Sequence, residues 1–342
     1  MGNACYSRLV LVASCLLAVA VAQAGDEDWK ARIAECAEAR DPEVRLACFD
    51  RVSAGIRAQD GDEEPTPVDE SPALVKASRM NLFWELDDDT HSGRGRIRPF
   101  QPLLAVPARW SSAPNERPIS PTGEAIDDFP LDSLEAHFRL SLRTKVWENP
   151  FGDNGDLWFA YTQNAYWQSY NSSESSPFRE TNYRPEVFSV WRVGVPLSER
   201  WSWRMLSLGL MHESNGRGSV LGISRSWNRL YANFGFEGPN TEVYVRPWVR
   251  VLREDPDDNP DIEDFLGYGD VQIIHHLNSQ RIDLTARWNP STGKGMARLG
   301  YHFPLVGDLH GFLSVFSGYG ESLLDYNHRQ TTVSAGISMF QF

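Results

Sequence analysis

Residues 135–146 read EAHFRLSLRTKV, and apolar and polar side chains alternate along nearly all of this stretch. The even positions are mostly Ala, Phe, Leu and Val, whereas the odd positions include His, Ser, Lys and two Arg. A repeat of two residues is typical of a β-strand, because successive side chains point to opposite faces of the sheet. Cationic residues opposite an apolar face suit a membrane barrel whose interior is polar.

Segments with this alternation recur from residue 98 onward and are separated by turn residues. The twelve predicted strands are 98–110, 134–146, 156–168, 184–196, 200–214, 225–237, 241–252, 265–277, 281–288, 295–303, 310–318 and 330–342. An even number is what a closed single-chain bacterial barrel requires. The predicted fold is therefore all-β, a twelve-stranded antiparallel transmembrane β-barrel.

The predicted connections alternate in length. Short ones such as 238–240 and 278–280 follow long ones such as 111–132, which predicts tight periplasmic turns at one end and outer loops at the other. The last strand would then finish on the periplasmic side, where Phe340 and Phe342 would belong to an aromatic girdle.

A soluble β-sandwich or barrel with one wet face would also alternate in this way. The 12 Trp and 11 Tyr, several near predicted strand ends, favour the interfacial belts of a membrane protein. No uncharged stretch after the N-terminus approaches the ~20 residues that a spanning helix needs, so any insertion would be as a barrel. The formal net charge of −13 argues against nucleic-acid binding, which needs clustered Lys and Arg.

The first 24 residues have the layout of a secretory signal peptide, and the protein is expected in the bacterial outer membrane. Arg8 precedes an uncharged apolar run, and Ala22-Gln23-Ala24 is a suitable cleavage site. A lipoprotein modified at Cys15 is the alternative, although it would truncate the apolar run.

Residues 25–58 place apolar and charged side chains at helical spacing, which predicts a short helical hairpin in the periplasm. A disulfide between its Cys36 and Cys48 would stabilise so small a unit in an oxidising compartment. Residues 59–78 are acidic and contain several Pro, which predicts an extended linker. Residues 79–342 then form the barrel domain.

The fifth and sixth predicted strands carry a candidate catalytic group on their apolar face. His212 and Ser214 share the parity of the preceding leucines, and Asn228 shares the parity of the apolar residues on the next strand. Pairing the strands symmetrically about Val220 sets His212 opposite Asn228. A serine hydroxyl needs a base, and the base needs a third group to orient it, so these residues suit a Ser-His-Asn triad. A neutral Asn also avoids an unpaired carboxylate near hydrocarbon.

A Ser, a His and an Asn at a strand end are often ordinary interfacial polar residues, but here the surrounding motifs are longer. They are HESNGR at 212–217, SRSWNRLY at 224–231, ESSPFRETNY at 174–183, DDNPDI at 257–262 and SGYGESL at 317–323. Together these motifs resemble the outer membrane phospholipase A family over roughly residues 80–342.

The resemblance implies a calcium-dependent phospholipase with A1, A2 and lysophospholipase activity that acts as a homodimer. It implies that Ser214 is the nucleophile, His212 the general base and Asn228 its orienting partner. The Gly216 amide and a calcium-bound water would then form the oxyanion hole.

The resemblance also implies the calcium ligands, which are oxygens as a hard cation prefers. They would be the Arg217 carbonyl and the Ser224 hydroxyl of one subunit with Ser175 of the other, and Gln163 would lie at the dimer interface. Residues 218–223 depart from the family pattern, because they look longer and lack its Asp and Pro, and Glu213 stands where Asp is expected.

Two alternatives remain open from the sequence. The first is a barrel without catalysis, a channel or an adhesin, and the second is an esterase that needs no metal. The acidic run 255–261 lacks the glycine and closing Glu of an EF-hand loop, and we interpret it as a solvated outer loop. His275 and His276 are adjacent on a strand, so their rings point to opposite faces and are interpreted as structural.

Overall fold

The computed structural model describes residues 33–38, 42–59, 78–120, 123–124, 130–218, 222–253 and 255–340. The chain divides into two compact units, Met1–Leu74 and Val75–Phe342. The predicted signal peptide lies outside the described residues, as does nearly all of the predicted linker. Among the described residues, no helix is both long enough and apolar enough to cross a membrane.

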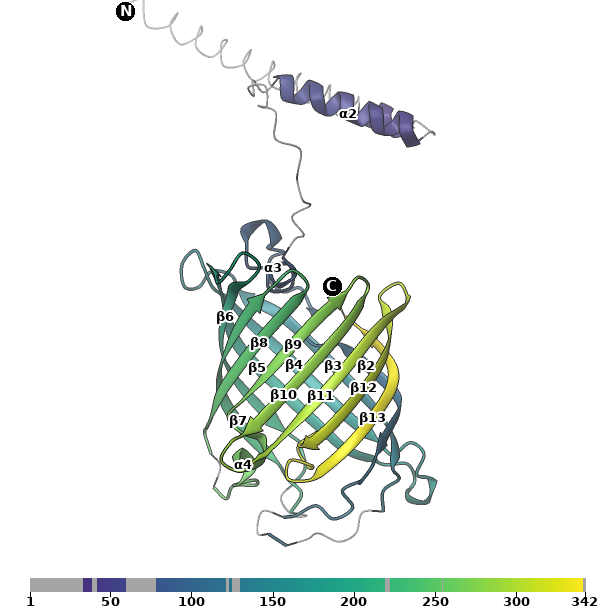
Figure 1. Cartoon of the computed structure of the whole chain (residues 1–342), viewed down its shortest axis with the longest axis vertical. Helices are drawn as coiled ribbons and strands as arrows, with labels where there is room; N and C mark the ends of the chain where they lie inside the picture. Colours follow the sequence, from purple (N-terminus) through teal and green to yellow (C-terminus); the bar gives the residue numbers. More distant parts are fainter. Residues whose placement is uncertain are drawn as a thin grey trace, which may run out of the picture. The chain divides into compact units, whose positions relative to one another are not determined.

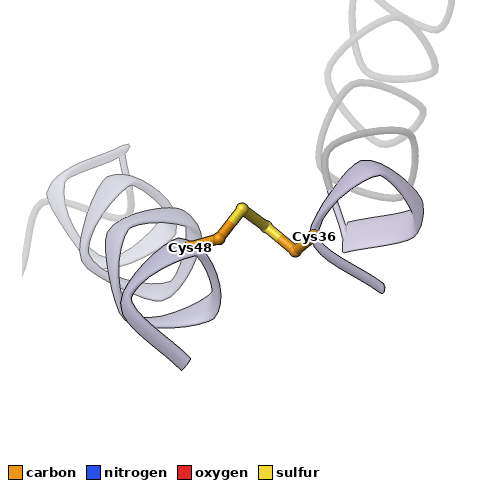
Figure 2. The surroundings of a disulfide bond; sticks show 2 residues. All are labelled: Cys36 and Cys48. Carbon is orange, nitrogen blue, oxygen red and sulfur yellow. A yellow bond between two sulfur atoms is a disulfide. The ribbon is translucent and has the colours of Figure 1, made fainter. Parts of the chain in front are cut away.

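The first unit contains two helical segments joined by a disulfide. Residues 33–38 are helical, and α2 spans Pro42–Gln59. Figure 2 shows the bond between Cys36 and Cys48, whose Cα atoms lie 5.4 Å apart. Cys36 and Val52 are buried, so the small apolar interior of this hairpin lies beside the disulfide.

The second unit is a closed antiparallel barrel of twelve strands (Figure 1). The barrel strands are β2 (Leu103–Ser111), β3 (Leu134–Trp147), β4 (Asp156–Trp167), β5 (Phe178–Pro196), β6 (Ser202–Ser214), β7 (Ser226–Glu237), β8 (Thr241–Val251), β9 (Gly269–Leu277), β10 (Gln280–Asn289), β11 (Lys294–Val306), β12 (Leu309–Tyr319) and β13 (Arg329–Met339). Each pairs with its neighbours in sequence, and the pairing of β13 with β2 closes the ring. The predicted fold class is confirmed.

Several strand boundaries differ from the prediction. The segment 98–110 is divided into β1 (Arg98–Pro99), which pairs with β3, and β2. β5 begins at Phe178 because residues that looked like a loop pair with β4. A short helix, α4 (Ile262–Leu266), precedes β9, and β13 ends at Met339.

The period-two pattern has the expected meaning on the barrel wall. On β3, Phe138 and Leu140 are exposed, whereas His137 and Arg143 are buried, so apolar side chains face outward and cations face the lumen. Phe340 corrects the prediction of a terminal aromatic girdle, because it is only 6% exposed. Its ring stacks on His310, and a bulge between β13 and β2 accompanies the change of parity. Phe342 lies outside the described residues.

The short-turn end of the lumen is filled by α3 (Arg79–Trp84), which lies near the C-terminal end in Figure 1. Ser78 caps this helix and also donates a hydrogen bond to Glu237 on β7. Met80 and Trp84 are buried, and the Trp84 indole donates to the Tyr244 hydroxyl. The main apolar core therefore lies inside the barrel beside α3. One further helical turn, η1 (Asp88–Thr90), follows α3.

The opposite end carries the long loops and α4 (Figure 1). The loop from β12 to β13 folds back into the barrel, and its Leu323 and Tyr326 are buried. Arg179 on β5 pairs with Glu135 on β3 and with Asp325 of this loop, with nitrogen to oxygen distances of 2.9 Å. A cavity of about 260 Å³ remains in the lumen between this network and α3.

Candidate active site

The candidate triad lies where β6 ends and β7 begins, at the long-loop end of the barrel. The register pairs His212 with Asn228, as the sequence predicted. His212 Nδ1 lies 2.9 Å from Asn228 Oδ1, within hydrogen-bonding distance. Ser214 is two residues beyond His212 on the same face of β6, and all three side chains are half-buried.

This face of the barrel is apolar up to the triad. Leu208 and Leu210 precede His212 on β6, and Leu230 follows Asn228 on β7; each is about half exposed. Exposed leucines in a barrel wall are what a lipid-facing band requires. The triad is therefore a small polar group at the edge of an apolar wall.

The Asn228 side chain is fixed by a second contact that the sequence did not reveal. Its Nδ2 donates to the Leu252 carbonyl at 3.1 Å. The amide orientation follows from this contact, because Nδ2 faces a carbonyl and Oδ1 is left for His212. Leu252 just follows β8 and has a left-handed φ of 48°, which turns the chain back after the strand.

Glu213, the residue between His212 and Ser214, points into the lumen. Its carboxylate accepts from the Trp227 indole and pairs with Arg229, both of which are buried on β7. This strand segment is therefore held from inside while its outer face carries the triad. Glu213 therefore has a structural role in holding this strand, although the family pattern has Asp at its position.

The loop after β6 is organised around Asn215, which is buried. Its side-chain Nδ2 donates to the Ile223 carbonyl at 2.8 Å, and its Oδ1 accepts from the Arg225 amide at 3.0 Å. Gly216 follows with φ +65°, and a Cβ there would lie 2.9 Å from the Tyr183 ring. Both its backbone and its surroundings therefore favour glycine.

The expected calcium residues lie in two loops at this end. The Ser224 hydroxyl donates to Asp258 Oδ2 at 2.5 Å. The Arg217 side chain lies 3.5 Å from the Glu180 carboxylate. Ser175 follows a short helical turn, η2 (Ser172–Glu174), in the loop between β4 and β5.

Hydroxyl, carbonyl and carboxylate oxygens are the donors that calcium prefers, so these residues fit the ion. Within the described part of the chain, no three His, Cys, Asp or Glu side chains are grouped closely enough to hold a metal. A cation here would thus depend on Ser224 and on backbone oxygens. Part of the intervening loop, 219–221, lies outside the described residues.

Asp258 changes the interpretation of the acidic run 255–261, which is more than a solvated loop. Besides the contact of Asp258 with Ser224, Asp257 pairs with Arg250, and Asp261 accepts from the Tyr326 hydroxyl. These contacts attach the loop after β8 to the segment before β7, to β8 itself and to the loop between β12 and β13. The acidic cluster and the DDNPDI motif were the sequence signals in this loop.

The expected interface residue Gln163 lies on the outer wall of β4. It pairs in register with the exposed Leu140 of β3, is half-buried, and accepts a hydrogen bond from the Tyr161 hydroxyl at 3.0 Å. An amide on a lipid-facing wall is costly unless its polar atoms are hydrogen-bonded, and the contact with Tyr161 uses only the amide oxygen. The amide nitrogen of Gln163 therefore suits a wall that is covered by protein.

Comparisons with known proteins agree with this architecture. The family model described as phospholipase A1 matches residues 80–339. The phospholipase A1 of Klebsiella pneumoniae is 35% identical over 294 residues, which cover 86% of this chain and 96% of the relative.

Two solved structures are similar over most of the barrel. One is outer membrane phospholipase A from Escherichia coli with an active-site asparagine replaced by alanine, with a TM-score of 0.66, 34% identity and coverage of 76% of this chain and 95% of that chain. The other is the Salmonella typhi outer membrane phospholipase dimer with bound calcium, with a TM-score of 0.65, 33% identity and the same two coverages.

Proposed function

This chain belongs to the phospholipase A1 family and is an ester hydrolase of the bacterial outer membrane, and we propose that it cleaves phospholipid acyl esters with Ser214, His212 and Asn228. The observation that carries the proposal is the 2.9 Å contact of His212 with Asn228, two residues from Ser214 on an apolar wall. An active-site asparagine in the Escherichia coli relative supports the role of Asn228.

The hydrogen bond to Asn228 selects the tautomer of the neutral His212 ring. Asn228 Oδ1 can only accept, so Nδ1 of the imidazole carries the proton and Nε2 keeps a free lone pair. Nε2 takes the proton of Ser214 as Oγ attacks the ester carbonyl, and then returns it to the departing alcohol of the lysophospholipid. Water attacks the acyl-serine in a second round, with His212 again as base, and a fatty acid leaves.

Negative charge develops on the carbonyl oxygen during each attack. The Asn215 amide already donates to the Arg225 carbonyl, so the Gly216 amide is the next backbone donor after the nucleophile, at a position whose conformation favours glycine. Calcium, when bound, supplies positive charge beside this oxygen. Loss of one such donor typically lowers kcat by about 10²–10³-fold.

The position of the triad suits a membrane substrate. A phospholipid in the outer leaflet would lie with its ester groups near the triad and its acyl chains along the leucines of β6 and β7. The acyl chain therefore stays in hydrocarbon throughout the reaction. A soluble ester would lack this contact and is expected to be a poorer substrate.

Calcium and dimerisation belong together in the proposal. Arg217 and Ser224 would hold the ion in one subunit, Ser175 would be contributed by the partner, and Gln163 would lie in the contact. The Salmonella typhi relative, a dimer with bound calcium, supports this arrangement. A site shared between subunits makes metal binding and dimerisation mutually stabilising.

The rival function, a non-catalytic channel or adhesin, is less well supported. α3 fills one end of the lumen, and the inward loop with the Arg179 network fills the other. A channel needs a continuous polar path, and neither filled end provides one within the described residues.

The test is fatty-acid release from phosphatidylcholine by detergent-refolded protein, with calcium and with excess EDTA. Calcium-dependent release is expected, and release that EDTA does not alter would leave the esterase but refute the metal. No release in either condition, from protein with normal heat-modifiable folding, would favour the non-catalytic barrel.

A variant tests the calcium ligands directly. Ser224→Ala should raise the calcium concentration for half-maximal activity by about 10-fold or more, because a ligand and its contact with Asp258 are lost. Ser291→Ala, in the loop between β10 and β11 at the same end, is the matched control and should leave the calcium response unchanged.

A further inference from the structure

The lumen has an excess of positive charge inside an acidic protein. Eight arginines and five carboxylates line the central cavity, whereas the whole chain has a formal net charge of −13. Charge removed from bulk water is costly unless it is paired. The excess therefore raises the question of what compensates it.

The carboxylates are already committed to other partners. Glu213 pairs with Arg229 and Asp270 with Arg246 on one side of the cavity. On the other side, Asp283 and Glu242 each accept from a histidine, His302 and His276. Glu321 binds Arg109 at 2.5 Å and is 4.0 Å from the nearest cavity arginine.

In the part of the chain that the structure describes, six of the eight arginines have no carboxylate oxygen closer than 3.9 Å, and four of these six act on one another. We define these four as the lumen arginine cluster: Arg139, Arg184, Arg287 and Arg298. The charges of Arg184 and Arg298 oppose that of Arg139, and the charge of Arg298 opposes that of Arg287, so the four positive charges interact with one another. The more distant Asp283 and Asp270 offset part of this repulsion.

Their hydrogen bonds do not neutralise them. Arg139 donates to the neutral Asn164 amide, and Arg287 donates to the carbonyls of Tyr319 and Gly320. Arg184 Nε lies 3.9 Å from Glu186 Oε1. Among the described residues, its Nε and Nη2 are buried without a hydrogen-bond partner, as is Nε of Arg287.

We propose that the cavity binds a small phosphate-type oxyanion within the lumen arginine cluster. The planar guanidinium forms two parallel hydrogen bonds to phosphate oxygens, and a dianion would offset most of the excess charge. The cavity of about 260 Å³ has room for such an ion with several waters. The filled ends exclude an intact lipid, so the ligand is free phosphate or a water-soluble phosphomonoester released from a headgroup.

The test uses the full chain in detergent micelles and follows thermal unfolding by Trp fluorescence. Inorganic phosphate should raise the midpoint by about 5 °C in a saturable way, because a ligand of the native state stabilises it. Sodium chloride at matched ionic strength should not. An equal rise with chloride would refute a phosphate site and indicate charge screening alone. Broadening of the phosphorus NMR signal checks binding directly.

Variants separate the site from general stability. Arg139→Gln and Arg287→Gln should each weaken phosphate binding at least 10-fold, while their stability without phosphate stays equal or rises because like charges are removed. Arg253→Gln, an exposed arginine paired with Glu263 in an outer loop, is the control and should bind normally. Unchanged binding in both cluster variants would overturn the proposal.

The two sources of the phosphate group can be told apart with glycerol 3-phosphate. Competition with inorganic phosphate would support a site that also takes headgroup fragments. A response to inorganic phosphate alone would support a site for the free ion.

Discussion

The two walls of the β6–β7 hairpin face different solvents, and their polar residues differ accordingly. The outer wall carries His212, Ser214 and Asn228 at the edge of a leucine surface, where His212 bonds to Asn228 and Asn228 bonds to a nearby carbonyl. The inner wall carries Glu213 and Arg229, which are paired. Because side chains alternate between faces, one strand can carry candidate catalytic residues on its outer face and stabilising ion pairs on its inner face.

The largest effect should come from replacing the serine of the triad on the outer wall. A serine on the inner wall of the same strand is its control. Ser214→Ala should lower phospholipid hydrolysis by about 10⁴-fold or more, because the nucleophile is lost, without changing the unfolding midpoint. Ser207→Ala, on the same strand but buried toward the lumen, should change activity less than about 2-fold. The two are compared by fatty-acid release per folded molecule. Equal activity of both variants would remove Ser214 from the mechanism.

The next effect concerns stability and belongs to the lumen. Arg179→Ala leaves Asp325 buried without its charged partner and leaves Glu135 with Arg109 alone, so it should lower the free energy of unfolding by about 3–5 kcal/mol. Arg253→Ala, which breaks an exposed pair, should cost less than about 1 kcal/mol. Urea unfolding monitored by heat-modifiability measures both. Similar values for the two variants would contradict a distinct role for the inner network.

A smaller loss is expected when the orienting residue of the outer wall is removed. Asn228→Ala should lower kcat by about 10²-fold, less than loss of an ionised orienter, because a neutral amide only holds the imidazole in place. Asn233→Ala, on the inner wall of β7, is the matched control. The pH profile of kcat should move only in the first variant, and a shift in both would indicate a general distortion of the hairpin.

The smallest effect is a pH dependence at the long-loop end. Burial acts to raise the pKa of Asp325, but the Arg179 charge and the Ser322 hydroxyl outweigh it, so the pKa lies below its ordinary value. The ionised Asp325 carboxylate therefore stabilises the fold fully at pH values above the ordinary pKa of an aspartate, which is about 4. This contribution is lost as pH falls through the depressed pKa.

Asp325→Asn should consequently be less stable than the natural protein at pH 7, and the difference should shrink below about pH 4. Urea unfolding at several pH values measures it. A difference that stays constant with pH would assign the effect to packing of the loop rather than to its charge.

Most of the fold was predictable because it depends on local parity. The hairpin register that pairs His212 with Asn228 follows from chain symmetry about one residue, so it needs no distant information. The start of β5 was missed because Arg179, Glu180 and Asn182 are polar yet buried in the lumen, which obscures the alternation.

The parts of the site that could not be predicted come from other segments. Leu252 and Asp258 reach the triad region from the loop after β8, where they contact Asn228 and Ser224. The spacing of residues in the sequence does not predict how this loop folds. Nothing about Leu252 indicates that its carbonyl holds Asn228, because any residue has that carbonyl. The acidic run around Asp258 did predict an exposed loop, but not its attachment to Ser224.

The pairing of β2 with β13 has a consequence for biogenesis. The hairpin of the triad joins neighbouring strands and can form as soon as both are available, whereas the ring needs strands from opposite ends of the barrel sequence. Until β13 arrives, two unpaired edges are open to other chains. The hairpin that carries the proposed triad can therefore form before the lipid-facing surface is complete, and an unfinished barrel is recognisable by its edges to any factor that supervises assembly.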